Sequence, residues 1–161
     1  MRLYLASDHA GFDLKRSLLD ALAAEGREAL DLGATALDPA DDYPDFITPL
    51  AERVAAEPGA LGVAIGGSGE GEAMAANRVK GARAAVFYGP RSATGAIEIE
   101  GTTAGGDGYD LVRLARAHND ANILSLGTRF LTDAEALEAV RIFVATPFSG
   151  LPRHARRLAK F

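Results

Sequence analysis

The feature that most constrains the fold is the alternation of short apolar runs with longer amphipathic stretches along the whole chain. Each of five runs rich in Val, Ile, Leu or Ala is predicted to be a strand; they are residues 2–6, 28–32, 61–65, 82–87 and 122–126. The stretches between them have helical periodicity, as at Leu14, Leu18 and Leu22. Apolar strands separated by helices are typical of a parallel sheet covered on both faces. The sequence therefore predicts a three-layer, Rossmann-like α/β fold with a five-stranded parallel sheet.

The predicted helices place the remaining apolar positions on the faces of that sheet. They cover residues 11–25, 45–56, 72–78, a stretch around 111–115, 132–145 and 152–160. Thr132 and Glu135 have the spacing of a capping box, and Pro147 ends the helix that they begin. The last helix is basic. At 161 residues the chain has the size of a single domain, 1–161.

One segment, 89–108, does not fit the regular alternation. Its glycines are Gly89, Gly95, Gly101, Gly105, Gly106 and Gly108. So long a glycine-rich connection inside a compact domain is typical of either a functional or a mobile loop, and the sequence does not choose between them.

Composition excludes several classes of function. The chain has no cysteine, which excludes disulfides, thiolate nucleophiles and Cys-based metal sites. A formal charge of -5 argues against nucleic-acid binding. No apolar run has the length of a signal peptide or of a membrane-spanning helix, so we expect a cytoplasmic protein with no membrane partner. The three histidines lack metal-ligand spacing, so we expect neither a catalytic metal nor a cofactor.

Polar groups follow three of the predicted strands, where ligands bind in open parallel sheets. The most distinctive group is the glycine loop, which we define as residues 66–72, with Gly67, Gly69 and Gly71 in alternation. Its amides could bind an anion, but the spacing matches neither a Walker loop, nor the dinucleotide motif, nor a serine-hydrolase elbow. Carboxylates at Glu70 and Glu72 would repel a phosphate. The loop is better interpreted as a base together with an oxyanion hole.

Each of these residues also has a simpler explanation. Glu72 could be an acidic residue of a first helical turn, and amides around it would lower its basicity unless water is excluded. Asp8 could be an N-cap, and His118 could be a partner of a helix dipole. Arg153 and Arg157, four apart on one helix face, could be solvated, or with Arg129 could contact a phosphate.

Several separated motifs together resemble those of ribose-5-phosphate isomerase type B, in the wider group that includes galactose-6-phosphate isomerase subunits. The motifs are residues 7–12 (SDHAGF), 42–46 (DYPDF), 66–72 (GGSGEGE), 75–78 (AANR), 115–121 (ARAHNDA), 127–129 (GTR) and 153–157 (RHARR). They occur in the order of that family and span nearly the whole chain.

The resemblance implies a role for each candidate residue. Glu72 would be the base that moves a proton between C1 and C2, and His118 the acid that opens the furanose. The remaining residues would bind substrate. The sugar hydroxyls would be held by Asp8, Ser68 and Asn119, and the enediolate would be stabilised by the amides of Gly67, Ser68, Gly69, Glu70 and Gly71. The phosphate would be bound by His9, Arg129, Arg153 and Arg157. The terminal arginines of such proteins cross a homodimer interface, which implies shared active sites in a homodimer that could pair further into a tetramer.

Two departures from the family pattern stand out. Many relatives have a cysteine base where this chain has Gly66, and this sequence resembles the branch with a glutamate matching Glu72 instead. The segment 89–108 looks like an insertion that precedes the His118 helix. The resemblance implies isomerisation of ribose 5-phosphate and ribulose 5-phosphate; another sugar phosphate, or binding without turnover, are the alternatives.

Overall fold

The protein is described by a computed structural model over residues 1–99 and 106–160. Its strands are β1 (Leu3–Ser7), β2 (Ala29–Asp31), β3 (Leu61–Gly66), β4 (Ala84–Phe87) and β5 (Ile123–Gly127). They form one sheet in the order β2-β1-β3-β5-β4, and every pair is parallel. The predicted fold class and five-stranded sheet are confirmed.

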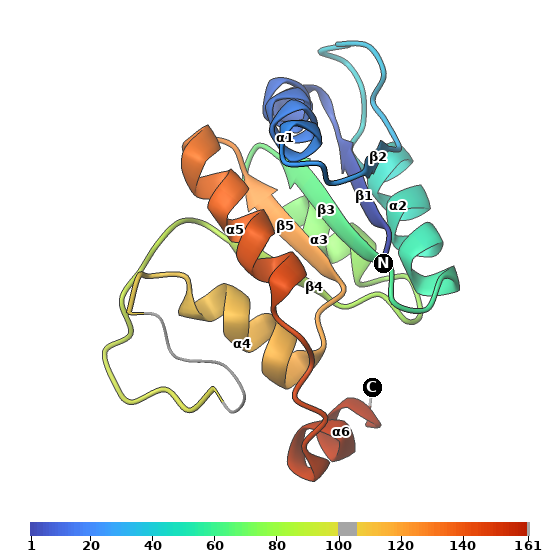
Figure 1. Ribbon diagram of the computed structural model, residues 1–161. Helices are drawn as coiled ribbons and strands as arrows, with labels where there is room; N and C mark the ends of the chain where they lie inside the picture. Colours follow the sequence, from blue (N-terminus) through green and yellow to red (C-terminus); the bar gives the residue numbers. More distant parts are fainter. Residues whose placement is uncertain (100–105, 161) are drawn as a thin grey trace.

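Helices cover both faces of the sheet (Figure 1). They are α1 (Phe12–Ala24), α2 (Pro44–Ala56), α3 (Glu70–Ala76), α4 (Asp110–Asn119), α5 (Asp133–Ala145) and α6 (Pro152–Leu158). Residues of α1, α4 and α5 share one buried apolar cluster with the strands, and residues of α2 and α3 share a second. The two clusters are the two sides of the predicted three-layer core. None of the described helices is long and apolar enough to cross a membrane.

The described helices and strands begin at or within two residues of their predicted starts, and α3 begins at Glu70, two residues early. Two of these differences have a visible cause. A 3-10 turn, η1 (His9–Gly11), precedes α1, because the Asp8 carboxylate accepts hydrogen bonds from the amides of Ala10 and Gly11. Strand β4 begins two residues late, since the Arg83 amide donates to the Asn122 side chain at 2.7 Å instead of to a neighbouring strand.

Helix α6 lies apart from the other helices, beyond the end of the sheet where the strands begin (Figure 1). It is reached through residues 146–151 after α5, and its packing within the chain is on α4. The predicted insertion, 89–108, lies partly outside the described residues, because positions 100–105 fall within it. Its two ends meet where the Arg91 amide donates to the Gly108 carbonyl at 2.8 Å.

A buried ammonium ties α1 to the loop after β2. Lys15 is fully buried, and its Nζ donates to Asp31 Oδ1 and to the Ala34 carbonyl, both at 2.6 Å. Asp31 Oδ1 also accepts the Gly33 amide at 2.8 Å. These bonds fix the start of the loop that later carries Asp41.

Replacing Asp31 with Ala is expected to lower the free energy of unfolding by about 3 kcal/mol, because it leaves a buried charge without its counterion. Urea unfolding measures the loss. Asp20→Ala, which removes an exposed carboxylate of α1, is the control and should change stability by less than about 0.5 kcal/mol. Equal effects of the two substitutions would contradict the role of the Lys15 ion pair.

Candidate active site

Three strand ends meet at one edge of the sheet, which we call the carboxyl edge. Ser7 of β1 pairs with Ile65 of β3, and Gly66 of β3 pairs with Gly127 of β5. The strand order reverses between β1 and β3, so the residues after these two strands flank a topological switch point. Asp8 and His9, the glycine loop, and Arg129 all follow strands at this edge.

The glycine loop is held against β5 by its backbone. Ser125 Oγ is buried and donates to the Gly69 carbonyl at 2.6 Å, and the Thr128 amide donates to the Gly66 carbonyl at 2.9 Å. Gly69 has a φ of 80°, a left-handed conformation that favours glycine. A Cβ at Gly67 would lie 3.2 Å from Arg129 Cζ, so the guanidinium packs over the loop. The loop and Arg129 are therefore in direct contact, and the Arg129 amide also donates to the Gly67 carbonyl at 3.2 Å.

Glu72 lies in a space that exists because residue 66 is glycine. Its side chain is 4% exposed, and a Cβ on Gly66 would overlap its carboxylate. Its Oε2 is buried and has no hydrogen-bond partner among the described residues. A first-turn glutamate that only interacts favourably with the helix dipole would be exposed to solvent. The burial of Glu72 therefore argues against that simpler explanation.

Burial raises the pKa of Glu72, and the nearby Asp8 carboxylate raises it further. The amides of Glu72 and Gly69 lower the pKa but do not cancel the effect of burial. The sequence left open whether burial or the nearby amides would have the larger effect on the pKa of Glu72. In the structure the effect of burial is larger, which makes the carboxylate more basic. A buried carboxylate with a raised pKa is suited to proton abstraction.

Asp8, His9 and the neighbouring loop residues complete this edge. Asp8 is 6% exposed and caps η1, as its simpler explanation predicts. His9 Nδ1 lies 2.6 Å from Asp41 Oδ1, and this hydrogen bond raises the pKa of His9. Ser68 is exposed, with its Oγ accepting the Glu70 amide at 3.3 Å. The Glu70 carboxylate accepts a hydrogen bond from the hydroxyl of Tyr88, not from the loop.

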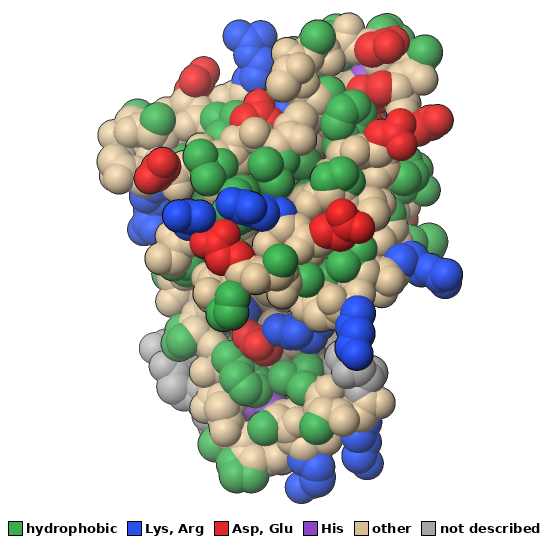
Figure 2. All heavy atoms as spheres, turned by 90° about the vertical axis from the view of Figure 1, so that its right-hand side faces the viewer, with side chains coloured by type: hydrophobic (Ala, Val, Ile, Leu, Met, Phe, Trp, Pro, Cys, Tyr) green, Lys and Arg blue, Asp and Glu red, His purple; other side chains and the backbone are tan. Residues whose placement is uncertain are grey.

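A second group of predicted residues surrounds a cavity of about 430 Å³ next to α6. His118, Arg153 and Arg157 line it. The other lining residues are Ala96, Ile97, Glu98, Leu114 and His154. The rings of His118 and His154 lie 4.1 Å apart between centroids, and His118 Nε2 is buried with no hydrogen-bond partner among the described residues. Side chains of Lys and Arg gather over α6 at this end of the molecule (Figure 2).

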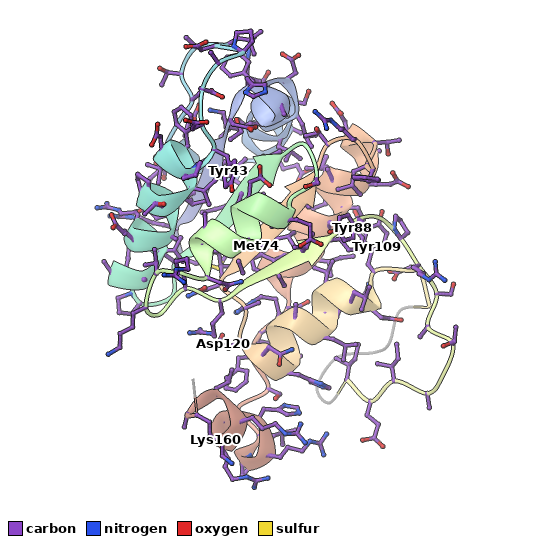
Figure 3. All side chains as sticks on the ribbon, turned by 180° about the vertical axis from the view of Figure 1, so that it is seen from behind. Tyr43, Met74, Tyr88, Tyr109, Asp120 and Lys160 are labelled. Atoms are coloured by element: carbon purple, nitrogen blue, oxygen red, sulfur yellow. The ribbon has the colours of Figure 1, made fainter. Side chains whose placement is uncertain are left out.

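Within one chain the two groups lie at opposite ends of the sheet. The start of β5, which follows the His118 helix, pairs with Gly62, whereas Glu72 lies beside Gly66. The strand between these two glycines alone spans about 13 Å. In Figure 3, Tyr43, Met74 and Tyr88 mark the region around α3, and Asp120 and Lys160 mark the other end. Asn119 is exposed there and faces a hollow along β4.

Two contacts in these groups were not predicted from the sequence. Asp41 supports His9 from an irregular loop, and His154 is 2% exposed and packs against His118. The charge pattern around Asp41 gives no signal for its role, because Asp38 and Asp42 are equally acidic. The ARAHNDA and RHARR motifs contain His118 and His154, yet no sequence spacing indicates that their rings meet.

Comparisons with known proteins agree with the resemblance. A sequence model of the family described as Ribose/Galactose Isomerase matches residues 3–103 and 108–161, so the break between the matches falls in the glycine-rich segment. The ribose-5-phosphate isomerase B of Mycolicibacterium paratuberculosis is 43% identical over 158 residues, which cover 98% of this chain and 87% of that protein.

Solved structures give the same result. Ribose-5-phosphate isomerase B from Mycoplasma genitalium, solved with bound ribulose-5-phosphate, is 36% identical with a TM-score of 0.82, covering 99% of this chain and 92% of that chain. The enzyme from Thermotoga maritima is 34% identical with a TM-score of 0.82, covering 99% and 95%. On fold, motifs and full-length similarity together, the chain belongs to the Ribose/Galactose Isomerase family.

Proposed function

We propose that the protein is an aldose–ketose isomerase that interconverts ribose 5-phosphate and ribulose 5-phosphate without a cofactor. The relatives with this activity in their names match the chain over nearly its whole length. The observation that carries the proposal is the buried Glu72 carboxylate beneath Gly66, with its raised pKa, at the switch point of the sheet. A protein that only binds sugar phosphates has no need of such a base.

In the proposed reaction Glu72 removes the proton from C2 of open-chain ribose 5-phosphate. The electrons of the C2–H bond form the C1–C2 double bond of a cis-enediolate, and negative charge develops on the C1 oxygen. Amides of residues 67–71 stabilise that oxygen. The proton on the C2 hydroxyl then moves to the C1 oxygen. Return of the proton from Glu72 to C1 converts the C2 oxygen to a carbonyl, which gives ribulose 5-phosphate. Beforehand His118 donates a proton to the ring oxygen, the bond between C1 and the ring oxygen breaks, and the C1 hydroxyl releases its proton to solvent as C1 becomes the aldehyde.

Binding groups come from both ends of the chain. Asp8, Ser68 and Asn119 hold hydroxyls of the sugar, and His9, Arg129, Arg153 and Arg157 hold its phosphate. Because Glu72 and His118 lie at opposite ends of one sheet, the complete site requires the α4 and α6 end of a second copy in a homodimer. The projecting position of α6 supports this arrangement (Figure 1).

A mixing experiment tests the shared site. Glu72→Gln and His118→Asn variants are each expected to be nearly inactive. Unfolding and refolding an equal mixture should restore about a quarter of wild-type activity, since half of the dimers are mixed and each has one site with both groups intact. If no activity returned although mixed dimers had formed, Glu72 and His118 would belong to one chain's site.

The pH dependence of turnover should reflect Glu72. The base must be ionised, and its pKa is raised, so the acidic limb of kcat/KM is expected above the ordinary glutamate value of 4.5. Activity falls as the pH decreases through the folded-state pKa, because the carboxylate becomes protonated. Steady-state kinetics across pH measures this limb; a limb at or below 4.5 would contradict the effect of burial on Glu72.

A second candidate keeps the chemistry and changes the sugar to a tetrose or hexose phosphate. One observation favours testing it: Ile97 and Glu98, from the glycine-rich segment, line the cavity that contains His118 and Arg153. Glu98 Oε2 lies 3.8 Å from Arg153 Nη2, so this segment contacts Arg153, one of the residues proposed to bind the phosphate. Isomerisation assays on a panel of tetrose, pentose and hexose phosphates distinguish the two candidates by kcat/KM.

A further inference from the structure

Asp41, from the loop between β2 and α2, supports His9 through two hydrogen bonds. Its Oδ1 accepts the backbone N–H of His9 at 3.0 Å and lies 2.6 Å from the ring Nδ1. The Asp41 side chain is 9% exposed, whereas the His9 ring is 35% exposed. A buried carboxylate therefore holds an imidazole that faces solvent, and it fixes both the backbone and the ring.

This geometry assigns the two ring nitrogens different tasks. Nδ1 is engaged by an acceptor, so it carries a proton that it donates to Asp41. Nε2 lies on the other side of the ring and is left to meet a ligand. The second oxygen of Asp41, Oδ2, is buried without a hydrogen-bond partner among the described residues. Among the described residues, the Asp41 carboxylate is therefore hydrogen-bonded to His9 alone. Its negative charge favours the imidazolium form of His9.

In the part of the chain that the structure describes, the charged groups that act on His9 are the carboxylates of Asp41 and Asp8 and the guanidinium of Arg129. The hydrogen bond to Asp41 is the largest cause of the raised pKa of His9, and Arg129 acts against it. The sum of these effects keeps the imidazole charged to higher pH than an isolated histidine.

A divalent cation is the competing ligand for this corner. Asp8, His9 and Asp41 offer potential metal-ligating atoms that all lie within 4.8 Å of one another. However, Asp8 Oδ1 already accepts two amides, and Asp41 Oδ1 already binds His9. Arg129 also places a positive charge beside the imidazole. An imidazolium next to a guanidinium fits a phosphate dianion better than a cation.

We propose that Asp41 is a positioning residue that keeps His9 in the imidazolium form with Nε2 directed at the substrate phosphate. The proposal rests on the phosphate-binding role of His9 in the proposed function. It assigns to Asp41 a role in phosphate affinity, and not in proton transfer at the sugar carbons.

The test compares wild type with Asp41→Asn. Calorimetry measures the affinity of each protein for inorganic phosphate between about pH 6 and 9. The Asn side chain keeps a carbonyl oxygen for both hydrogen bonds and removes the charge. Phosphate affinity is expected to fall about tenfold near pH 8, and the pH at which affinity declines should shift downward. In turnover, KM should rise more than kcat falls. Asp42→Asn removes a neighbouring exposed carboxylate and is expected to leave the pH profile unchanged.

A double variant distinguishes the proposed action of Asp41 through His9 from a purely structural role of Asp41. In a His9→Gln background, Asp41→Asn should have no further effect on phosphate affinity; an equal loss in both backgrounds would overturn the proposal. An unchanged pH profile in Asp41→Asn would also overturn it, as would Zn²⁺ binding that Asp41→Asn abolishes without altering phosphate affinity.

If Asp41→Asn does not fold, wild type and His9→Gln are compared directly. Their phosphate affinities should differ at low pH and converge above the pKa of His9. NMR titration of the His9 ring in wild type should give a midpoint above 6.5, and a midpoint at or below that value would overturn the proposal. The measurements of phosphate binding and ring titration do not depend on turnover, so they remain informative even if the protein does not isomerise ribose 5-phosphate.

Discussion

Replacing Glu72 with Gln is expected to lower kcat for ribose 5-phosphate by about 10²- to 10⁴-fold, the usual contribution of a general base. Gln has nearly the same shape as Glu, so it fills the buried space beneath Gly66 and leaves the rest of the site in place. It cannot accept the C2 proton. Steady-state kinetics should therefore show a large loss in kcat and a change in KM of less than about threefold.

The neighbouring carboxylate provides the matched comparison for this variant. Glu70 is exposed, and its carboxylate accepts a hydrogen bond from the Tyr88 hydroxyl. Glu70→Gln is expected to lower kcat by less than about tenfold, because this side chain has no position from which to take the proton. If Glu72→Gln retained turnover within about tenfold of wild type, the assignment of the base would be wrong.

Replacing Gly66 with Ala is expected to lower kcat by at least about 100-fold, although residue 66 contributes no functional group. The added methyl group would overlap the Glu72 carboxylate and force it out of its buried position. The same assay measures the loss. Gly95→Ala is the control, because a Cβ there meets nothing within 4 Å and should leave turnover unchanged.

A double variant shows whether the effect of Gly66→Ala acts through Glu72. In the Glu72→Gln background, Gly66→Ala should cost little more activity, because the base is already absent. Additive losses would mean that the methyl group disturbs something else. The overlap also gives a physical reason why the family that the sequence resembles has either a cysteine base at position 66 or a glutamate base at position 72. A side chain at position 66 and the carboxylate of Glu72 compete for one volume.

The fold could be predicted from the sequence because its signals are local. Each strand is a short apolar run, and each long helix has an apolar face, so strand number and layer order follow from periodicity. Two of the boundary errors fall where side chains cap or replace backbone hydrogen bonds. Asp8 caps a 3-10 turn before α1, and Asn122 takes the amide of Arg83 before β4 begins. Asn122 lies 39 residues after Arg83, so this second exchange leaves no periodic signal in the sequence.

The candidate site could be predicted only in part. Glycines and polar residues after strands locate Asp8, His9 and the glycine loop at the carboxyl edge, because parallel strands all end there. The burial of Glu72 has no sequence signal, since it depends on the missing side chain at Gly66 and on the packing of the loop. Asp41 lies in an irregular loop among other acidic residues, so its bond to His9 depends on the path of that loop.

The distance between Glu72 and His118 follows from topology. A helix that precedes a parallel strand ends at the edge where the strand begins, and α4 precedes β5. The proposed reaction uses both residues, whereas the chain places them at opposite ends of its sheet. The proposed function therefore requires a site completed by a second copy.

The most direct test of the proposed isomerisation is to incubate the wild-type protein with ribose 5-phosphate in D₂O and follow the sugar by NMR. Ribulose 5-phosphate is expected to form with deuterium at C1, and the C2 proton signal of the remaining ribose 5-phosphate is expected to disappear as the reaction reverses. Saturable binding of ribose 5-phosphate with no ribulose 5-phosphate formed and no loss of the C2 proton would contradict it.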